Sequence, residues 1–180
     1  CNLAKIWNEP RKSGELAEFV GIILGDGGIS DYQVRVSLNR ELEQDYLQFV
    51  ANLIHKLFGE EPKKHNKNTP KKVADICISG VKLVELLQKL GLEKGNKVIH
   101  QVEVPLWVWE RREYTISCLR GLIDTDGCIF LHDHMAYKVR YLNLGMCFSS
   151  HSQPLLNFVY NALNRLGYTA KRRDYNVFLY

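Results

Sequence analysis

Two hydrophobic periodicities divide the chain into helices and strands. In some segments apolar residues recur every three to four positions, which predicts helices. Other segments alternate apolar and polar residues, which is typical of half-buried strands. The predicted helices span residues 15–25, 41–58, 81–90, 115–125 and 152–166, and the predicted strands lie within residues 29–39, 62–79, 128–149 and 171–180. The order of elements in the first half largely returns in the second.

Glycines and short polar runs mark where these elements end. Gly59, Gly91 and Gly167 each follow an amphipathic segment and are suited to stop a helix. We place the turn between the two strands of residues 128–149 at His132-Asp133-His134. Two histidines at this spacing can share one face of a strand and resemble a metal site. No further ligand cluster is visible in the sequence, so a turn is the preferred interpretation.

A nine-residue segment occurs twice. Residues 19–27 (FVGIILGDG) return as residues 119–127 (LRGLIDTDG), 100 positions later, and both copies end in Asp-Gly. Small residues are four apart in each copy, Gly21 and Gly25 in the first and Gly121 and Thr125 in the second. This spacing puts them on one helical face, where they allow two helices to approach closely. Such a contact would bring Asp26 and Asp126 together.

The repeat also predicts the domain organisation. We expect an N-terminal flank at residues 1–14, a first unit at 15–91, a linker at 92–114 and a second unit at 115–180. Later matches between the halves are offset by 109 instead of 100 positions, which predicts an insertion of about nine residues that lengthens the 128–149 hairpin. The second unit lacks a counterpart of helix 81–90, so we expect its C-terminal end to be incomplete.

Composition narrows the class of protein. The 180 residues are 46% hydrophobic and 24% charged, with a net charge of +4 and a pI near 8.8, as in a mildly basic globular protein. The five cysteines form no C-x-x-C pair, which argues against a zinc ribbon or a disulfide framework. No apolar run is long enough to span a membrane, and no secretory signal is evident. We therefore expect an intracellular protein, in the cytoplasm, nucleoid or an organelle matrix.

The paired acids indicate chemistry beyond packing. A tight helix contact explains the glycines but not two carboxylates at its end, because like charges repel and the helix dipole opposes an acid there. A cation between or beside them would remove this penalty. Oxygen ligands without thiols indicate a hard ion, most simply Mg²⁺. A purely structural contact between the helices is the alternative interpretation.

The two copies closely resemble the LAGLIDADG motif of homing endonucleases, and the resemblance covers nearly the whole chain. It implies an α+β fold of two pseudo-symmetric αββαββα units, each with a curved antiparallel DNA-binding sheet, packed through the two motif helices. It also implies metal binding by Asp26 and Asp126, with the backbone carbonyls of Gly25 and Thr125 as further ligands. A basic residue before the second motif often lines the site in this family; Lys97 fits that place best, with Lys94 as the competitor.

DNA contacts are expected from polar strand faces and basic clusters. The polar face of the first strand carries Gln33, Arg35 and Ser37, which suit base edges. Lysines suit phosphates. The remaining candidates are Lys63, Lys64, Lys71, Lys72, Lys138, Arg140, Arg172 and Arg173. A solvated surface position is the alternative for each of them.

The leading hypothesis is a site-specific, metal-dependent homing endonuclease of the intron-homing kind. It would hydrolyse phosphodiester bonds and make double-strand breaks in a long, pseudo-palindromic DNA target. Because both motifs lie in one chain, we expect a monomer. One alternative is a non-cleaving DNA- or RNA-binding protein on the same scaffold, a maturase or a regulator, although binding-only relatives tend to lose one of the acids. Another is the endonuclease part of an intein.

Overall fold

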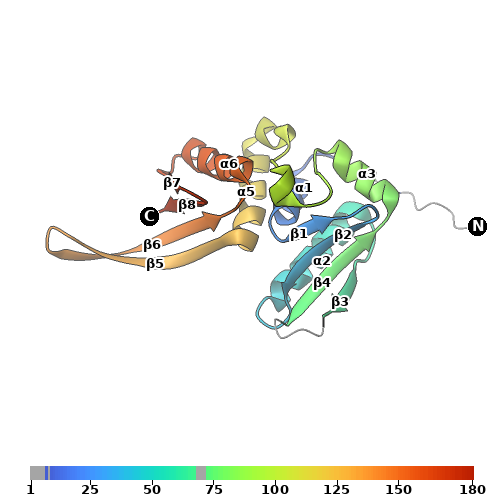
Figure 1. Ribbon diagram of the computed structural model, residues 1–180, viewed down its shortest axis with the longest axis horizontal. Coiled ribbons are helices and arrows are strands. Elements are labelled where there is room, and N and C mark those ends of the chain that lie inside the picture. Colours follow the sequence, from blue (N-terminus) through green and yellow to red (C-terminus); the bar gives the residue numbers. More distant parts are fainter. Residues whose placement is uncertain (1–6, 8, 68–71) are drawn as a thin grey trace, which may run out of the picture.

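The computed structural model describes residue 7 and residues 9–67 and 72–180, so Lys71 lies outside the described residues. Two four-stranded antiparallel sheets lie on either side of a central pair of helices, α1 (Gly14–Leu24) and α5 (Arg112–Asp126) (Figure 1). This arrangement confirms the predicted α+β fold. No helix in the described part of the chain has the length and apolar character needed to cross a lipid bilayer.

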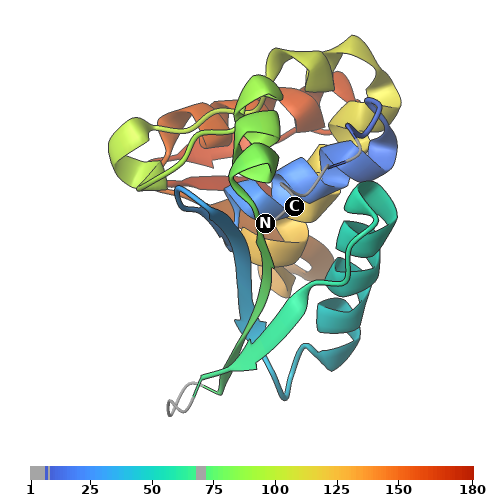
Figure 2. The same cartoon turned by 90° about the vertical axis from the view of Figure 1, so that its right-hand side faces the viewer.

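The first sheet has strand order β1-β2-β4-β3. Its strands are β1 (Gly27–Ile29), β2 (Gln33–Asn39), β3 (Lys63–Asn66) and β4 (Val73–Ser79). Helix α2 (Gln44–Phe58) covers one face of this sheet, as Figure 2 shows, and α3 (Val81–Lys89) follows β4. The alternation in β2 is the one expected from the sequence, because Val34, Val36 and Leu38 are buried and the intervening side chains are not.

The second sheet repeats this order as β5-β6-β8-β7. Its strands are β5 (Gly127–Ala136), β6 (Val139–Ser149), β7 (Lys171–Arg173) and β8 (Asn176–Leu179), and α6 (Gln153–Arg165) packs against it. Ser152 caps α6, since its hydroxyl accepts a hydrogen bond from the backbone N–H of Leu155 at 3.4 Å. The strands predicted within residues 171–180 and the helix opened by Ser152 are therefore confirmed.

The connecting segment is packed against the body. It contains a short helix, α4 (Lys97–His100), and a 3-10 helix, η1 (Leu106–Glu110). Trp107 is buried and donates from its indole nitrogen to the carbonyl oxygen of Leu90 at 3.0 Å. Trp109 lies edge-to-face against Phe158, with ring centroids 4.9 Å apart. These aromatic rings therefore serve packing.

Two local expectations were wrong, and one short strand was not expected. His132-Asp133-His134 is not a turn: all three residues belong to β5, and the chain reverses at Tyr137 and Lys138, both with positive φ. The strand expected within residues 29–39 is β2, and a further short strand, β1, precedes it across the reversal between Ile29 and Gln33. Helix α2 begins at Gln44 and not at residue 41, so Leu42 lies outside the helix and is exposed.

The β5–β6 hairpin is longer than expected. Ile29 pairs with Val34 across four residues, whereas the matching pair Ile129 and Met146 encloses sixteen. The hairpin insertion is thus twelve residues instead of nine. The stretch from Met146 to Gln153 is three residues shorter than the matching stretch from Val34 to Gln44, which restores the offset of 109.

Candidate active site

Helices α1 and α5 cross so closely that only glycine fits at the crossing. A Cβ on Gly21 would lie 2.3 Å from the carbonyl oxygen of Cys118, and one on Gly121 would lie 2.4 Å from that of Glu18. Both neighbours are backbone atoms, which cannot turn away as a side chain does. The small residues of the repeat therefore set the distance between the two helices, as their spacing indicated.

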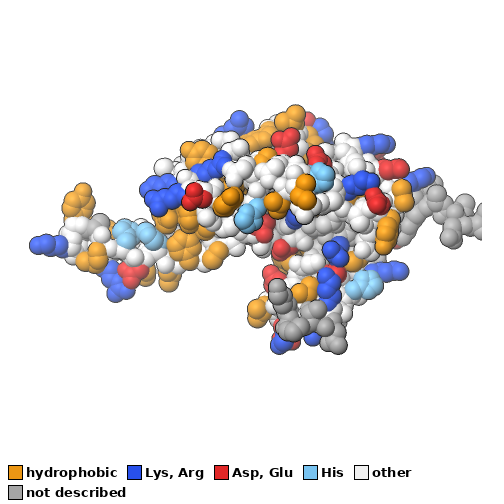
Figure 3. Space-filling model, viewed as in Figure 1, with side chains coloured by type: hydrophobic (Ala, Val, Ile, Leu, Met, Phe, Trp, Pro, Cys, Tyr) orange, Lys and Arg blue, Asp and Glu red, His pale blue; other side chains and the backbone are white. Residues whose placement is uncertain are grey.

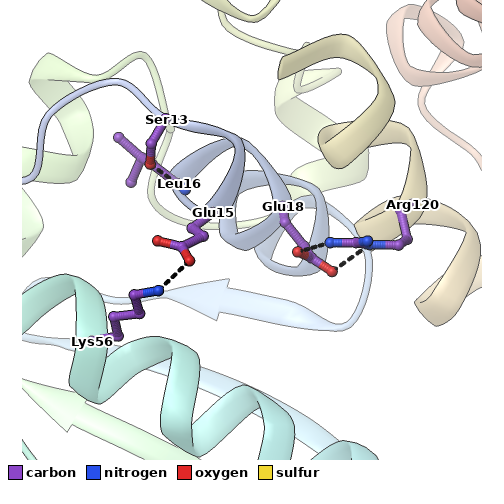
Figure 4. Close-up of polar contacts among 6 residues, drawn as sticks. All are labelled: Ser13, Glu15, Leu16, Glu18, Lys56 and Arg120. Atoms are coloured by element: carbon purple, nitrogen blue, oxygen red, sulfur yellow. Dashed lines mark hydrogen bonds and ion pairs between the residues drawn. The ribbon is translucent and has the colours of Figure 1, made fainter. Parts of the chain in front are cut away.

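Polar contacts orient α1 at the same time (Figure 4). Ser13 caps the helix by accepting from the N–H of Leu16 at 3.1 Å. Glu18 is 3% exposed and accepts two hydrogen bonds from the guanidinium of Arg120 on α5. Glu15 forms an ion pair with Lys56 of α2. These contacts hold α1 against α5 on one side and α2 on another.

The two motif acids lie where the crossing helices end. Gly25 is the C-cap of α1, and Asp126 is the last residue of α5. A Cβ on Gly25 would lie 1.9 Å from Oγ1 of Thr125 and 3.4 Å from Oδ2 of Asp126, so the first helix end meets the carboxylate of the second. Asp26 directly follows Gly25, and the negative charge of Asp126 raises its pKa. The structure therefore brings Gly25, Asp26, Thr125 and Asp126 together.

The electrostatics of these acids favour a cation. Burial, followed by the charges of Asp126 and Glu43, raises the pKa of Asp26 from 3.8 to about 6, and Lys97 opposes the shift. Burial also raises the pKa of Asp126, again against the effect of Lys97. Two neighbouring carboxyl groups are costly to ionise. A positive charge beside them makes the ionised form of both favourable.

Lys97 supplies one such charge from the connecting segment. Its ammonium group donates to the carbonyl oxygen of Leu24 at 3.1 Å and to that of Gly25. Burial lowers the pKa of Lys97, whereas the charges of Asp126 and Asp26 raise it. Lys94, the competing candidate, instead binds Asp31 at 2.6 Å. Of the two lysines, only Lys97 therefore reaches the acids.

A second acidic region lies beside the site and was not expected. A cavity of about 600 Å³ between the start of α2 and the end of α5 is lined by Glu43, Tyr46 and Asp124, among others. The hydroxyl of Tyr46 is buried and has no hydrogen-bond partner among the residues that the structure describes. Burial and then the charge of Asp124 raise the pKa of that hydroxyl. Sequence alone carried no sign that Glu43 would come near Asp26, because the two are brought together only by packing of α2.

The polar face of the first sheet forms a connected network. Ser37 donates to Oδ1 of Asp75 at 2.7 Å, and Lys67 forms an ion pair with Oδ2 of the same acid at 2.9 Å. Nε of Arg35 lies 3.9 Å from Oδ2 of Asp75. The side-chain amide of Gln33 donates to the hydroxyl of Ser79 at 3.1 Å. Asp75 was not among the expected residues. The polar position of Asp75 within an apolar strand was the available signal.

The expected lysines of the first unit do not share one face. Lys63 pairs with Cys77 of β4, as Arg35 does from the other side, so both side chains lie on the polar face. Lys64 pairs with the buried Ile76 and points to the opposite face. Lys72 forms an ion pair with Glu41.

The cations of the second sheet are also divided. Lys138 is exposed at the hairpin tip, whereas Arg140 binds Asp133 across the hairpin. Arg172 pairs with the buried Val177 and donates to Asn157 of α6, so it lies on the helix-covered face, opposite the expected polar face. Arg173 is exposed on β7. The register of β7 against β8 therefore puts Arg172 and Arg173 on opposite faces of the sheet, although the sequence did not distinguish them.

The oxygen atoms at the two motif ends suit a hard cation that takes its remaining ligands from water and phosphate. Among the described residues, no three His, Cys, Asp or Glu side chains gather into a group that could hold a metal ion. The motif ends offer two carboxylates and backbone carbonyl oxygens, all of the oxygen type that Mg²⁺ prefers. Since Mg²⁺ usually keeps waters and takes phosphate oxygens as ligands, two protein carboxylates fit such an ion.

Comparison with known sequences finds the same motif. Residues 113–176 match the family model of the LAGLIDADG-like domain. The chain is 30% identical over 152 residues to reverse gyrase of Methanocaldococcus jannaschii, covering 83% of this chain and 8% of that protein. It is 29% identical over 127 residues to a ribonucleoside-diphosphate reductase subunit of Bacillus subtilis, covering 64% and 11%. The chain thus spans only about a tenth of these relatives.

Comparison with solved structures gives the same fold. The homing endonuclease I-DmoI in complex with DNA and Mn superposes with a TM-score of 0.56 at 18% identity, covering 92% of this chain and 88% of that one. The LAGLIDADG meganuclease I-AabMI bound to uncleaved DNA gives 0.56 at 10%, covering 90% and 76%. Full-length DUF199/WhiA from Thermatoga maritima gives 0.57 at 14%, covering 94% and 52%.

The repeated motif, the helix crossing, the two sheets and these matches agree, and they confirm the resemblance inferred from the sequence. The chain contains a LAGLIDADG-like domain and has the fold of the LAGLIDADG homing endonucleases.

Proposed function

We propose that this protein is a metal-dependent, site-specific DNA endonuclease that hydrolyses one phosphodiester bond in each strand of a long duplex target. The observation that carries the proposal is the junction of the two motif ends. Two acids from different halves of the chain meet there, each with a raised pKa, beside the half-buried Lys97. Perturbed acids around a specific cationic partner are characteristic of functional sites.

Asp26 and Asp126 would hold the ion, with the carbonyl oxygens of Gly25 and Thr125 as additional ligands. A divalent ion bound there, Mg²⁺ in the simplest case, activates water and stabilises the leaving oxygen. Lys97 would stay beside the carboxylates and place its positive charge near the phosphate as negative charge develops. With one four-stranded sheet on either side of the helix pair, this site would lie between the two halves of a bound duplex.

The test removes the charge of each acid in turn. Asp26→Asn and Asp126→Asn should each lower double-strand cleavage of a target plasmid by about 10³-fold or more, since each removes a group that acts in the transition state. DNA affinity without metal should persist, because a negative charge that faces phosphate is gone. Asp124→Asn, on the same helix two residues earlier, is the matched control and should cleave like the wild type.

Two results would overturn the assignment. Wild-type cleavage rates in both variants would show that the acids do not act in catalysis. A folded wild-type protein that selects a DNA sequence and never cleaves it, with Mg²⁺ or Mn²⁺, would instead identify a binding protein on this scaffold. Selection of the target from random duplexes, followed by sequencing of the cleaved ends, supplies the substrate for both measurements.

A second candidate concerns the genetic setting of the domain, which is an intein or an intron. Reverse gyrase, a ribonucleotide reductase subunit and the tRNA-splicing ligase RtcB of Pyrococcus furiosus have different names and activities, yet each matches this chain over only 8–14% of its length. A segment that recurs within such different proteins is what a mobile inserted element would leave. This favours the endonuclease part of an intein over an intron-encoded enzyme.

The two genetic settings predict different products. If the domain lies in an intein, the gene contains host coding sequence in frame on both sides, and mass spectrometry finds the host protein joined without this segment. A reading frame that contains no host sequence would exclude the intein setting and leave the nuclease proposal unaffected.

A further inference from the structure

Two cysteines of the second sheet lie directly opposite each other. Cys128 of β5 pairs with Cys147 of β6, although nineteen positions separate them in the sequence. Directly paired residues of an antiparallel sheet have Cα atoms about 4.5–5.5 Å apart and side chains on the same face. A disulfide bond spans Cα distances of about 4.4–6.8 Å. The strand register therefore allows a bond between these two sulfur atoms without movement of the backbone.

This cysteine pair lies on an open face near the base of the β5–β6 hairpin. Figure 3 shows the hairpin as an arm that extends from the rest of the molecule. Cys128 is exposed and Cys147 is half-buried. Cysteine is among the residue types most often buried, so packing alone does not account for such a pair. The equivalent pair in the first sheet, Gly28 and Arg35, carries no thiol.

The other cysteines that the structure describes are enclosed. Cys77 is 5% exposed, and Cys118 is fully buried. Burial raises the pKa of both thiols, so both stay protonated at neutral pH. A protonated thiol is a poor nucleophile. Cys77 pairs with Arg35 and Lys63, and not with another cysteine. These two residues therefore serve as internal controls for the reactivity of the exposed pair.

We propose that Cys128 and Cys147 form a reversible dithiol–disulfide site whose co-substrate is a small disulfide such as oxidised glutathione. Both thiols are free in the structure. Cys147 donates to Oδ1 of Asn176 at 3.6 Å, and Sγ of Cys128 lies 3.9 Å from the carbonyl oxygen of Ile129. Rotation about χ1 moves each sulfur atom between staggered positions and can turn the two toward each other. The site does not depend on the proposed nuclease activity.

The exposure of the two thiols sets the order of the steps. The thiolate of the exposed Cys128 attacks one sulfur atom of the small disulfide, whose S–S bond breaks and releases one thiol. The thiolate of Cys147 then attacks Sγ of Cys128 in the mixed disulfide and releases the second thiol. The protein loses two electrons and two protons, and the small disulfide gains them. A dithiol reductant reverses both steps.

The bond would hold the hairpin closed at its base. Strand β8 pairs with β6 only as far as Met146, and beyond it residues 130–136 and 139–145 pair only with each other in the part of the chain that the structure describes. A strand pair with few other contacts opens more readily than a packed sheet. A covalent bond limits that opening. Cys128 follows Asp126 by two positions, so the bonded strand is the one that leaves the candidate active site.

Peptide mapping of the full chain tests the bond. Reduced protein is incubated with oxidised glutathione, blocked with iodoacetamide in urea and digested with trypsin without reduction. Cleavage after Lys138 and Arg140 separates the two cysteines into peptides 121–138 and 141–165. We expect these peptides to be linked, with a mass two hydrogen atoms below their sum, and to be released by dithiothreitol. The peptides that contain the enclosed cysteines should carry no glutathione.

Two single substitutions separate the roles of the two thiols. Cys147→Ser removes the thiol that completes the bond, so Cys128 should retain one glutathione that the wild type releases. Cys128→Ser removes the exposed thiol, so the attachment of glutathione should slow about tenfold or more. Amide hydrogen exchange of residues 130–145 should slow about tenfold when the wild type is oxidised, and it should stay unchanged in both variants.

Three results would overturn the inference. Glutathione retained on Cys128 of the wild type, or no reaction there at all, would show that the two thiols do not act as a pair. A linked peptide that joins an isotope-labelled chain to an unlabelled one would assign the bond to two molecules. A bond to Cys1, which lies outside the described residues, would identify a different pair. Reduced protein that cleaves no DNA would overturn the nuclease proposal alone.

Discussion

Among single residues, Asp26 carries the clearest electrostatic signature. Its pKa is raised mainly by burial and then by Asp126 and Glu43, so the ionised form is costly in the metal-free fold. The same position becomes favourable once a cation is bound. Asp26 therefore lowers the stability of the metal-free protein and favours the binding of a positive ion. Such a cost in stability is common at functional positions.

This trade predicts how stability depends on pH. The unfolded chain ionises Asp26 near 3.8, whereas the folded chain retains the proton up to about 6. Because the folded state binds more protons in this window, the stability of the metal-free protein should fall as pH rises from about 4 to 6. In chelator at neutral pH, Asp26→Asn should therefore be more stable than the wild type in urea unfolding.

Two further observations complete that experiment. The advantage of Asp26→Asn should shrink toward pH 4, where both forms are uncharged. Added Mg²⁺ should stabilise the wild type and not the variant. An Asp26→Asn protein that is less stable than the wild type at every pH would show that this carboxylate is stabilising without metal, against its raised pKa.

Among the structural elements, the α1–α5 crossing determines whether the site exists at all. Gly21→Ala would place a methyl group 2.3 Å from the carbonyl oxygen of Cys118, so the helices must move apart. We expect a loss of about 3 kcal/mol or more in unfolding free energy, in line with overpacking against rigid atoms. Gly28→Ala is the control, since a Cβ there meets nothing within 4 Å, and it should change stability by about 0.5 kcal/mol or less. Equal effects of the two substitutions would mean that the crossing is not tight.

Two adjacent lysines of strand β3 can test which face of the first sheet meets DNA. Lys63 lies on the polar face beside Arg35, whereas Lys64 points to the opposite face. If the polar face meets DNA, Lys63→Ala should lower the slope of log affinity against log salt by about 0.9, and Lys64→Ala should leave it nearly unchanged. Filter binding at several salt concentrations measures both. The reverse order would place DNA on the other face of the sheet.

For the whole molecule, the arrangement of the two halves predicts the stoichiometry. Both acids and both sheets come from one chain, so one copy should contain a complete site. We expect one chain per duplex in the cleaving complex. Analytical ultracentrifugation of the complex with target DNA measures this number, and two chains per duplex in the cleaving species would contradict the prediction. The unequal hairpins further imply that the target is only loosely palindromic.

The sequence by itself determined much of this architecture because several signals are local. Periodicity and glycine stops located the helices, and the repeated Asp-Gly ends singled out Asp26 and Asp126. The spacing of small residues indicated the close contact of α1 and α5, which the structure places at Gly21 and Gly121. These features depend on residues a few positions apart, so the chain displays them before it folds.

Only the tertiary structure decided the rest, because it depends on pairing between distant segments. The sequence preferred Lys97 to Lys94 only by its place before the second motif, whereas packing put Lys97 beside Gly25 and Lys94 beside Asp31. The hairpin turn lies at Tyr137 and Lys138, and not at the polar run before it, because strand register is selected by the whole β5–β6 pairing. Arg172 turns toward α6 for the same reason, since a shift of one position in register exchanges the two faces of a strand.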